Sequence, residues 1–283
     1  MCYKKELEEK GYCIIPNILS ANEVQECLSS FEKWIDSNEQ INAIHDKISP
    51  HGIIKHFEAG HQRHAWLVRT NPKVQEVFKT LWNTNELVVS YDGCCWLKEN
   101  VHKKDNIWTH TDQSPNKKGL YCYQGFVSFT NNKTRTLVVY EGSHKLHQEY
   151  FEKRNIKDSK DWQLIDHEYL NEIQITKKIL EVDAGSLVIW DSRTFHQNQY
   201  GKNPERRIVQ YVSYLPKQNR SKKMEEKRHK YLLDRRSTSH WAYPVKVNGL
   251  QPQMYGNKKL TIDYSKLETP VLDDLIPAIM QLI

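Results

Sequence analysis

The feature that most constrains this chain is a long succession of short apolar segments in its middle. From Leu87 to Tyr214 the segments are rich in Val, Ile, Tyr, Phe and Trp, and Gly, Asn, Asp and Pro separate them. This pattern is typical of antiparallel strands in a sandwich or barrel of the jelly-roll type. The predicted strands are Leu87–Tyr91, Ile107–Asp112, Tyr121–Phe129, Thr136–Tyr140, Ile179–Val182, Leu187–Trp190, Thr194–Asn198 and Arg207–Leu215.

Helices are predicted before these strands. Ser20 and Glu23 match a capping box, in which each side chain satisfies a free backbone donor of the other residue. An apolar stripe at helical spacing then continues to about Asp36, and a second such stripe covers Pro72–Trp82. The short apolar run Tyr12–Pro16 precedes both and predicts a strand. We therefore expect a mostly β fold with flanking helices.

Composition limits the class of protein. The 283 residues are 38% hydrophobic, which is enough for one large domain or two small ones. No apolar run approaches the roughly 20 residues that span a bilayer, and the first residues are charged, so we expect no membrane segment and a cytoplasmic location. The six cysteines show no CxxC spacing, which favours reduced thiols over zinc or disulfides.

The positive charge is confined to one segment. Between Lys217 and Arg236 lie nine Lys or Arg and three Asp or Glu, which accounts for the whole net charge of +6. The simplest interpretation is a solvated helix face, in which Glu225 and Glu226 pair with basic neighbours. Docking of a nucleic acid or another anionic partner on Lys217–Arg236 remains an alternative.

Three residues on the predicted strands suggest a metal site. His110 and Asp112 stand two positions apart, so in an extended strand they project from the same face. Alone this pair is a weak signal, because surface pairs on strands are common. His196, on a later strand that follows the Asp183–Gly185 turn, would complete the set. Two His and one carboxylate leave coordination positions open, as non-haem Fe(II) oxygenases require, whereas structural zinc sites are closed by a fourth ligand.

Arg207 opens the last predicted strand and suggests a binding site for an anion. It shares a face with Val209, Tyr211 and Ser213. An inward guanidinium needs an anionic partner, and the distal carboxylate of 2-oxoglutarate would suit its planar geometry. Two alternatives remain open: Arg206 points inward instead, or Arg207 pairs with an internal Asp or Glu.

Three segments together carry a family pattern. Trp108–Gln113 holds the His-x-Asp pair, Glu141–Lys145 reads Glu-Gly-Ser-His-Lys, and Asp183–His196 runs from a turn through an apolar strand to the distal His. In these segments the chain resembles the phytanoyl-CoA dioxygenase-like family of Fe(II)/2-oxoglutarate oxygenases. The resemblance covers roughly Leu7 to Pro216 and implies a double-stranded β-helix core, jelly-roll and cupin-like.

The resemblance also implies roles for single residues. It places Fe(II) on His110, Asp112 and His196, with 2-oxoglutarate on Arg207 and O₂ as the second co-substrate; ascorbate is the expected reductant in an assay. Further residues implied at the co-substrate are Gln124, Asn198 and Lys55; for Gln124 a structural role in its apolar strand is the alternative. His144, in the turn segment, is expected to be structural. The candidate walls of the substrate pocket are Trp108, Tyr91 and Trp190, for which core packing is the alternative.

The resemblance favours an oxygenase that hydroxylates a small molecule and releases succinate and CO₂. The carboxylate of Asp112 favours hydroxylation over halogenation. Two alternatives stay open: an oxygenase acting on a nucleic acid or a protein side chain, and a non-catalytic jelly-roll binding protein. Residues 1–216 are expected to form the oxygenase domain, and residues 217–283 a basic helical segment and an extension packed on it. The apolar face of Pro270–Met280 fits packing on the core or contact with a second chain, so no oligomeric state is predicted.

Overall fold

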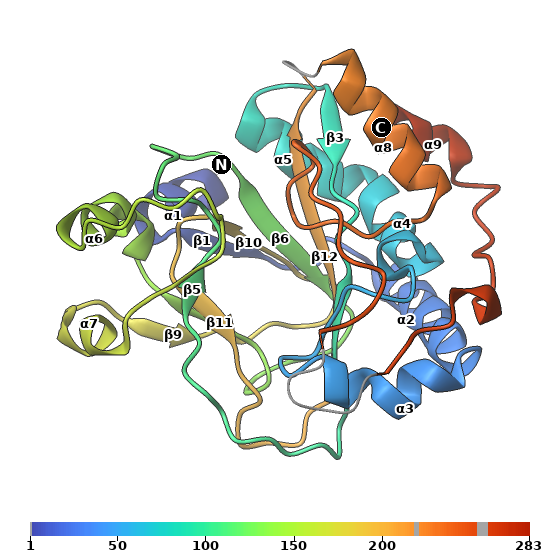
Figure 1. The fold of residues 1–283 in the computed structure, drawn as a ribbon, viewed down its shortest axis with the longest axis horizontal. Coiled ribbons are helices and arrows are strands. Elements are labelled where there is room, and N and C mark those ends of the chain that lie inside the picture. Colours follow the sequence, from blue (N-terminus) through green and yellow to red (C-terminus); the bar gives the residue numbers. More distant parts are fainter. Residues whose placement is uncertain (1, 218–220, 254–259) are drawn as a thin grey trace.

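In a computed structural model that describes residues 2–217, 221–253 and 260–283, the chain folds into two facing sheets with helices outside them (Figure 1). The helices are α1 (Cys2–Lys10), α2 (Ala21–Asp36), α3 (Glu39–Ile48), α4 (Arg63–Thr70), α5 (Pro72–Trp82), α6 (His147–Lys153), α7 (His167–Glu172), α8 (Lys222–Leu233) and α9 (Ile276–Gln281). The strands are β1 (Tyr12–Ile15), β2 (Ile53–Ile54), β3 (Leu87–Val89), β4 (Cys94–Leu97), β5 (His110–Thr111), β6 (Tyr123–Ser128), β7 (Leu137–Tyr140), β8 (Gln163–Leu164), β9 (Lys177–Ile179), β10 (Leu187–Asp191), β11 (His196–Asn198) and β12 (Arg207–Pro216).

All the strand pairings are antiparallel. The larger sheet has the order β1-β10-β6-β12-β4-β2, with β3 paired to β12, and the smaller sheet has the order β8-β5-β11-β7-β9. The strands of both sheets are almost entirely buried, except for the edge strands β8 and β9. Two antiparallel sheets with flanking helices confirm the predicted fold class.

The two predicted helices are confirmed, and their ends follow the predicted signals. At the start of α2, the Ser20 backbone N–H donates to Glu23 Oε2 at 2.6 Å, and the Glu23 backbone N–H donates to Ser20 Oγ at 3.4 Å. Asn71 caps α5 by accepting from the Lys73 backbone N–H at 2.9 Å, ahead of Pro72. None of the described helices is both long and apolar enough to cross a membrane.

One predicted strand is displaced and three others were not predicted. The predicted strand is Ile179–Val182, whereas β9 begins at Lys177 and ends at Ile179; Val182 forms only an isolated antiparallel bridge, with Asn132. The strand lies at the edge of the sheet with all three residues exposed, so apolar patterning does not mark it. The unpredicted strands β2, β4 and β8 lie outside the expected segments; β4 is a buried central strand beside β12.

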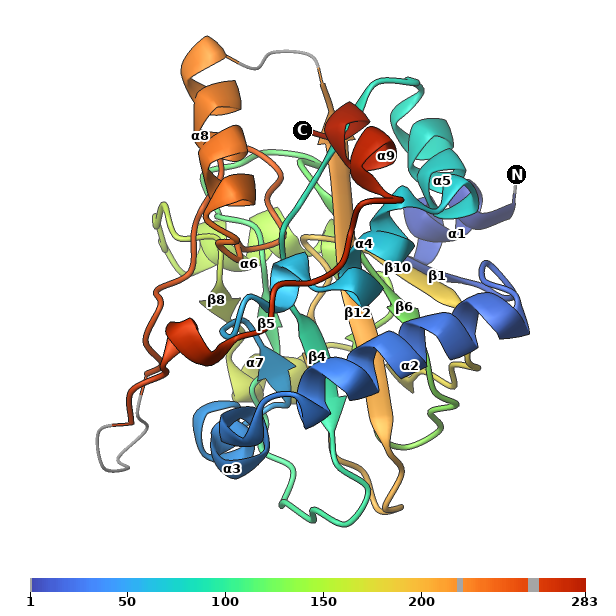
Figure 2. The same ribbon diagram turned by 90° about the vertical axis from the view of Figure 1, so that its right-hand side faces the viewer.

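A helical layer covers the outer face of the larger sheet (Figure 2). Helices α4 and α5 contact β12, α2 packs against α4, and α9 packs against α4 from the other side. Leu275, Ile279 and Leu282 of the C-terminal segment join this core, whereas Ile276 and Met280 are about half exposed. The apolar face at the C-terminus therefore packs on the protein's own core and leaves a smaller exposed strip.

Helix α8 carries the basic segment, and one of its residues is not solvated. Arg228 is only 1% exposed, and its guanidinium donates to the carbonyls of Ala242, Val89 and Leu282 at 2.7, 2.9 and 3.0 Å. The expectation of a solvated helix face is therefore wrong at Arg228. Through these hydrogen bonds, the Arg228 side chain connects α8 to β3 and to the C-terminal residues.

Replacing Arg228 with methionine should lower the free energy of unfolding by about 3 kcal/mol. Three buried carbonyls would lose a charged donor, and each unsatisfied acceptor costs about 1–3 kcal/mol. Urea unfolding would measure the change. Lys227→Met, on the exposed face of the same helix, is the matched control and should change stability by less than about 0.5 kcal/mol. Equal effects of the two substitutions would contradict the anchoring role.

Candidate metal centre and its cavity

The smaller sheet brings two of the predicted ligands together. Strands β5 and β11 pair with His196 directly opposite His110, and the centroids of the two imidazole rings lie 4.4 Å apart. Asp112 follows β5, and its backbone N–H donates to the Ser192 carbonyl at 3.0 Å, which fixes the segment beside the end of β10. Convergence of distant segments is therefore a direct consequence of the strand register.

The three side chains present their donor atoms to a common point. Asp112 Oδ2 lies 3.6 Å from His110 Nε2 and 3.3 Å from His196 Nε2, and all three donor atoms lie within 4.8 Å of one another. The other ring nitrogens are occupied, because Nδ1 of His110 and of His196 lie 3.0 and 2.8 Å from the carbonyls of Trp108 and Thr194. This bonding leaves each Nε2 lone pair free for a metal ion.

The electrostatic state of the three groups suits a divalent cation. Burial on its own would raise the pKa of Asp112, but the adjacent His110 and His196 outweigh it and hold that pKa well below its usual range. Burial, together with His110, lowers the pKa of His196. At neutral pH Asp112 is therefore a carboxylate and His196 a neutral imidazole, which are the ligand forms of both groups.

Gln124, predicted at the co-substrate, lines the same cavity as the three candidate ligands and contacts the carboxylate of Asp112. Its Nε2 donates to Asp112 Oδ2 at 3.1 Å from the facing strand β6 of the larger sheet. The contact joins the two sheets across the cavity. An amide in this position orients the carboxylate, as outer partners of metal ligands commonly do.

Arg207 lies inside the fold as predicted, and both alternatives are excluded for the described residues. The side chain is fully buried; Nη1 donates to Cys95 Sγ at 3.1 Å, while Nε and Nη2 have no partner. No described Asp or Glu forms an ion pair with it. Arg206 points outward and pairs with Glu32 at 2.7 Å. A buried guanidinium with open donors is costly unless a ligand completes them, so this site fits a carboxylate.

A cavity of about 250 Å³ is lined by the three candidate ligands, His110, Asp112 and His196. Asn198 lines it and donates from Nδ2 to the Tyr211 hydroxyl at 3.2 Å, close to Arg207 and Cys95. Lys55, Trp108 and Trp190 also line it. Tyr91 does not: its ring packs between His61 and Trp66, in the core under the helices. Core packing, the stated alternative, therefore describes Tyr91.

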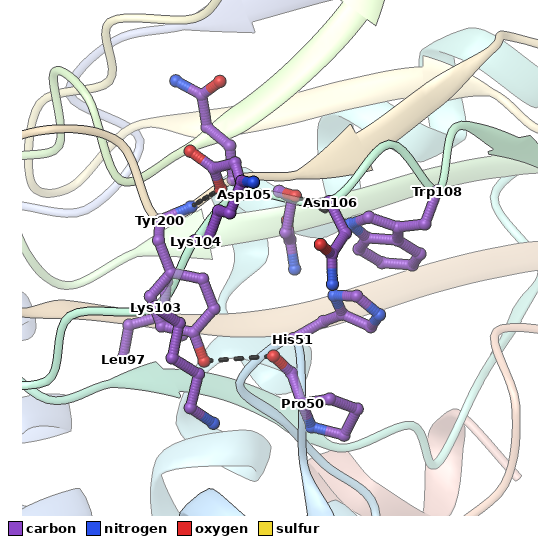
Figure 3. Close-up of a pocket in the computed structure, with 11 residues that line it drawn as sticks. Pro50, His51, Leu97, Lys103, Lys104, Asp105, Asn106, Trp108 and Tyr200 are labelled. Atoms are coloured by element: carbon purple, nitrogen blue, oxygen red, sulfur yellow. Dashed lines mark hydrogen bonds between the residues drawn. The ribbon is translucent and has the colours of Figure 1, made fainter. Parts of the chain in front are cut away.

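Trp108 also lines a second cavity, together with residues that include His51 and Tyr200 (Figure 3). The second cavity has a volume of about 330 Å³ and shares Trp108 and Asn198 with the first. The indole is stacked on His51, with ring centroids 3.7 Å apart, and on His110 at 4.7 Å. Its Nε1 donates to the Asn198 carbonyl at 3.0 Å. The ring is therefore held by stacking and by a hydrogen bond beside the candidate metal centre.

His144, expected to be a structural turn residue, contacts another part of the chain. Its Nε2 lies 3.2 Å from the Glu8 carbonyl in α1, and it is not among the residues that converge on the metal centre. This contact connects the Glu141–Lys145 turn to the N-terminal helix α1.

Several residues of the cavity were not found from the sequence. Thr238, Ser239, His240 and Asn248 line the cavity from a segment beyond Pro216. They lie outside the recognised resemblance, and no motif marks them. Cys95, which contacts Arg207, lies in the unpredicted strand β4. The only sequence signal that would have indicated Cys95 is the alternation of inward and outward side chains along a strand. Strand β4 has four residues, which are too few to show this alternation.

Comparisons with known proteins identify relatives of this chain. No family model matches it. The "Ava biosynthesis cluster protein O" of Aspergillus versicolor is 29% identical over 250 residues, which cover 79% of this chain and 80% of that protein. A Dictyostelium discoideum protein named "Putative phytanoyl-CoA dioxygenase" is 22% identical over 263 residues, which cover 74% and 73%.

Solved structures share the fold. The epimerase SnoN, in complex with Fe³⁺, α-ketoglutarate and nogalamycin RO, aligns with a TM-score of 0.54 at 18% identity, over 76% of this chain and 82% of that one. EctD from S. alaskensis, with 2-oxoglutarate and 5-hydroxyectoine, aligns with a TM-score of 0.53 at 15% identity, over 77% and 76%. The predicted jelly-roll core is therefore confirmed, and the predicted resemblance agrees with these relatives.

Proposed function

We propose that this chain, which has the fold of the Fe(II)/2-oxoglutarate-dependent oxygenases, is itself such an enzyme and hydroxylates a small molecule. The observation that carries the proposal is the convergence of His110, Asp112 and His196 beside a cavity that contains Asn198 and Tyr211, next to the buried Arg207. A metal-binding triad with open sides and a buried carboxylate receptor together match the needs of this chemistry.

Each residue has a role that follows from its position. His110, Asp112 and His196 would hold Fe(II), and Gln124 would orient the carboxylate of Asp112. Arg207 would bind the distal carboxylate of 2-oxoglutarate, beside Tyr211 and Asn198. The bound iron and co-substrate supply oxidation of a C–H bond by O₂, with succinate and CO₂ as co-products. Trp108 and Trp190 would exclude water and position the substrate.

Succinate formation tests this function. We expect the protein to convert 2-oxoglutarate to succinate when Fe(II), O₂ and ascorbate are supplied, and His110→Ala to reduce the rate at least about 100-fold. Metabolite extracts that increase the rate would then be searched for a product one oxygen atom heavier. His102→Ala, at an exposed histidine of the loop before β5, is the matched control. Absence of succinate from the wild-type protein would reject the proposal.

We also propose that residues 217–283 belong to the same domain as the oxygenase core. Arg228 bridges α8 to β3, and Arg235 pairs with Glu58 at 2.6 Å. Residues 238–240 line the metal cavity itself. Because several basic residues of this segment are used inside the protein, a nucleic-acid surface is the weaker interpretation of its charge.

A further inference from the structure

Residues 237–248, here called the C-terminal hairpin, form one wall of the metal cavity. The Ser239 backbone N–H donates to the Lys246 carbonyl, and the Asn248 backbone N–H donates to the Ser237 carbonyl, both at 2.9 Å. Thr238 and Val247 form an antiparallel bridge between these two bonds. These bonds hold the two ends of the hairpin together.

The hairpin is fixed to the core on both sides. Thr238 exchanges two hydrogen bonds with the Tyr91 backbone, at 2.8 and 3.0 Å. Lys246 forms an ion pair with Asp161, which also binds Lys117 at 2.6 Å. Asp161 further accepts from the Ser114 backbone N–H at 3.1 Å, two residues after the metal-binding Asp112. The wall is thus connected to the metal-binding segment.

The hairpin lies toward the end of the cavity that is remote from Arg207. Arg207 and Ser213 share one face of β12 and stand six residues apart, which is about 20 Å along a strand. Ser213 lines the cavity, and its carbonyl accepts from the backbone N–H of Ser90, the residue before Tyr91. Because Arg207 would bind the co-substrate, the end near Ser213 is left for the substrate.

Polar groups without partners gather at this end. Ser213 Oγ, Ser239 Oγ and His240 Nε2 are shielded from solvent and have no hydrogen-bond partner among the described residues, and all three residues line the cavity. An unsatisfied buried polar group costs about 1–3 kcal/mol. Such a group of unsatisfied polar atoms in a cavity wall is expected where a ligand completes the bonds.

The charges nearby indicate which kind of group would bind. Asp92, also in the cavity wall, is paired with Arg69 at 3.5 Å and accepts from Ser90 Oγ at 2.7 Å. Asp161 is balanced by its two lysines. Burial lowers the pKa of His240 to about 4, so its imidazole is neutral at pH 7. These groups therefore add no uncompensated charge to the cavity. Lys55, the remaining cation among the lining residues, is exposed, so solvent screens its charge, and a neutral partner is favoured for the shielded hydroxyls and imidazole.

We propose that Ser239 and His240 are specificity residues that bind a neutral hydrogen-bonding group of the substrate, such as a carboxamide or hydroxyl. The inference rests on the proposed oxygenase function and extends it to a substrate class: a compound with a neutral polar group at one end and a carbon skeleton that packs on Trp108 and Trp190. A purely hydrocarbon substrate would leave the three polar groups unsatisfied.

Paired probes test this recognition without the substrate. Benzamide and toluene share a ring and differ in the polar group, and saturation-transfer NMR would measure their binding to the protein with Fe(II) and 2-oxoglutarate under anaerobic conditions. We expect Ser239→Ala/His240→Leu to weaken benzamide binding about five- to tenfold and to leave toluene binding unchanged. When Ser239 is kept, His240→Gln should weaken benzamide binding less than the double variant does, because glutamine retains a hydrogen-bonding group. His167→Leu, at an exposed histidine of α7, should change the binding of neither probe.

Several outcomes would overturn the inference. These are equal affinity of the wild-type protein for the two probes, unchanged benzamide binding in the double variant, and an equal loss for both probes. If the double variant does not fold, as judged by circular dichroism, Ser239→Ala alone decides the question. The visible absorption of the Fe(II)–2-oxoglutarate complex is measured in the same samples. Its absence from the wild-type protein would reject the oxygenase function, whereas its presence with unselective probe binding would reject only the recognition role.

Discussion

Replacing Arg207 with methionine should raise the 2-oxoglutarate concentration needed for half-maximal succinate formation at least about 100-fold. The guanidinium is fully buried, and two of its donor atoms have no partner among the residues that the structure describes. A hydrogen bond to a charged group contributes about 1.5–3 kcal/mol, and about 2.7 kcal/mol corresponds to 100-fold in affinity. Fe(II) affinity should change little, because the metal-binding atoms belong to the other sheet.

The neighbouring residue supplies a matched control. Arg206→Met removes the same charge from the residue just before β12, but Arg206 is 38% exposed and pairs with Glu32. Its effect on the 2-oxoglutarate requirement should be less than about twofold, since exposed ion pairs contribute about 0–1 kcal/mol. Similar effects of the two substitutions would show that Arg207 acts through net charge and not through a bound carboxylate.

Stability provides a second measurement of the same site. Without co-substrate, Arg207 is a buried cation that no carboxylate of the described residues neutralises. Arg207→Met should therefore leave the free energy of unfolding unchanged or raise it by about 1–3 kcal/mol. 2-Oxoglutarate should raise the melting temperature of the metal-loaded wild-type protein and not that of the variant. Strong destabilisation of the variant would indicate a structural role instead.

The three residues of the candidate metal centre could be proposed from the sequence because their signals are local. His110 and Asp112 are two residues apart on one strand, and His196 follows an apolar strand bounded by a glycine turn. Gly185 in that turn has a φ of +82°, and an added Cβ would lie 2.6 Å from the Leu19 carbonyl, so the turn requires glycine. The alternation of side chains along a strand thus indicated the three candidate ligands without knowledge of the pairing between β5 and β11.

The substrate side was not predictable for the opposite reason. Ser239 and His240 reach the cavity through bonds to distant residues, such as Thr238 with Tyr91 and Lys246 with Asp161. Nothing in the order of residues 237–248 shows which face of a short hairpin turns inward. Tyr91 illustrates the same limit: its type and position suggested a pocket wall, but tertiary packing directs its ring into the core under the helices.

Replacing Asp112 with asparagine should lower the affinity for Fe(II) at least about 100-fold and abolish measurable succinate formation. The substitution keeps the shape of the side chain and removes the negative charge that faces His110 and His196. Gln124→Leu should cause a smaller loss, about tenfold, because it removes only the hydrogen bond that orients the carboxylate. Anaerobic titration with Fe(II), or with Co(II) as a stable substitute, would measure both affinities.

The order of these two effects is the critical result. Asp183→Asn, at an exposed position in the turn before β10, is the control for loss of one negative charge and should leave metal affinity unchanged. If Asp112→Asn bound Fe(II) as tightly as this control, the convergence of the three side chains would not be a metal site. If Gln124→Leu lowered the affinity for Fe(II) as much as Asp112→Asn, the amide would be as important to the metal site as the ligand itself. This outcome is conceivable because Gln124 bonds, from the opposite sheet, to the only carboxylate of the triad.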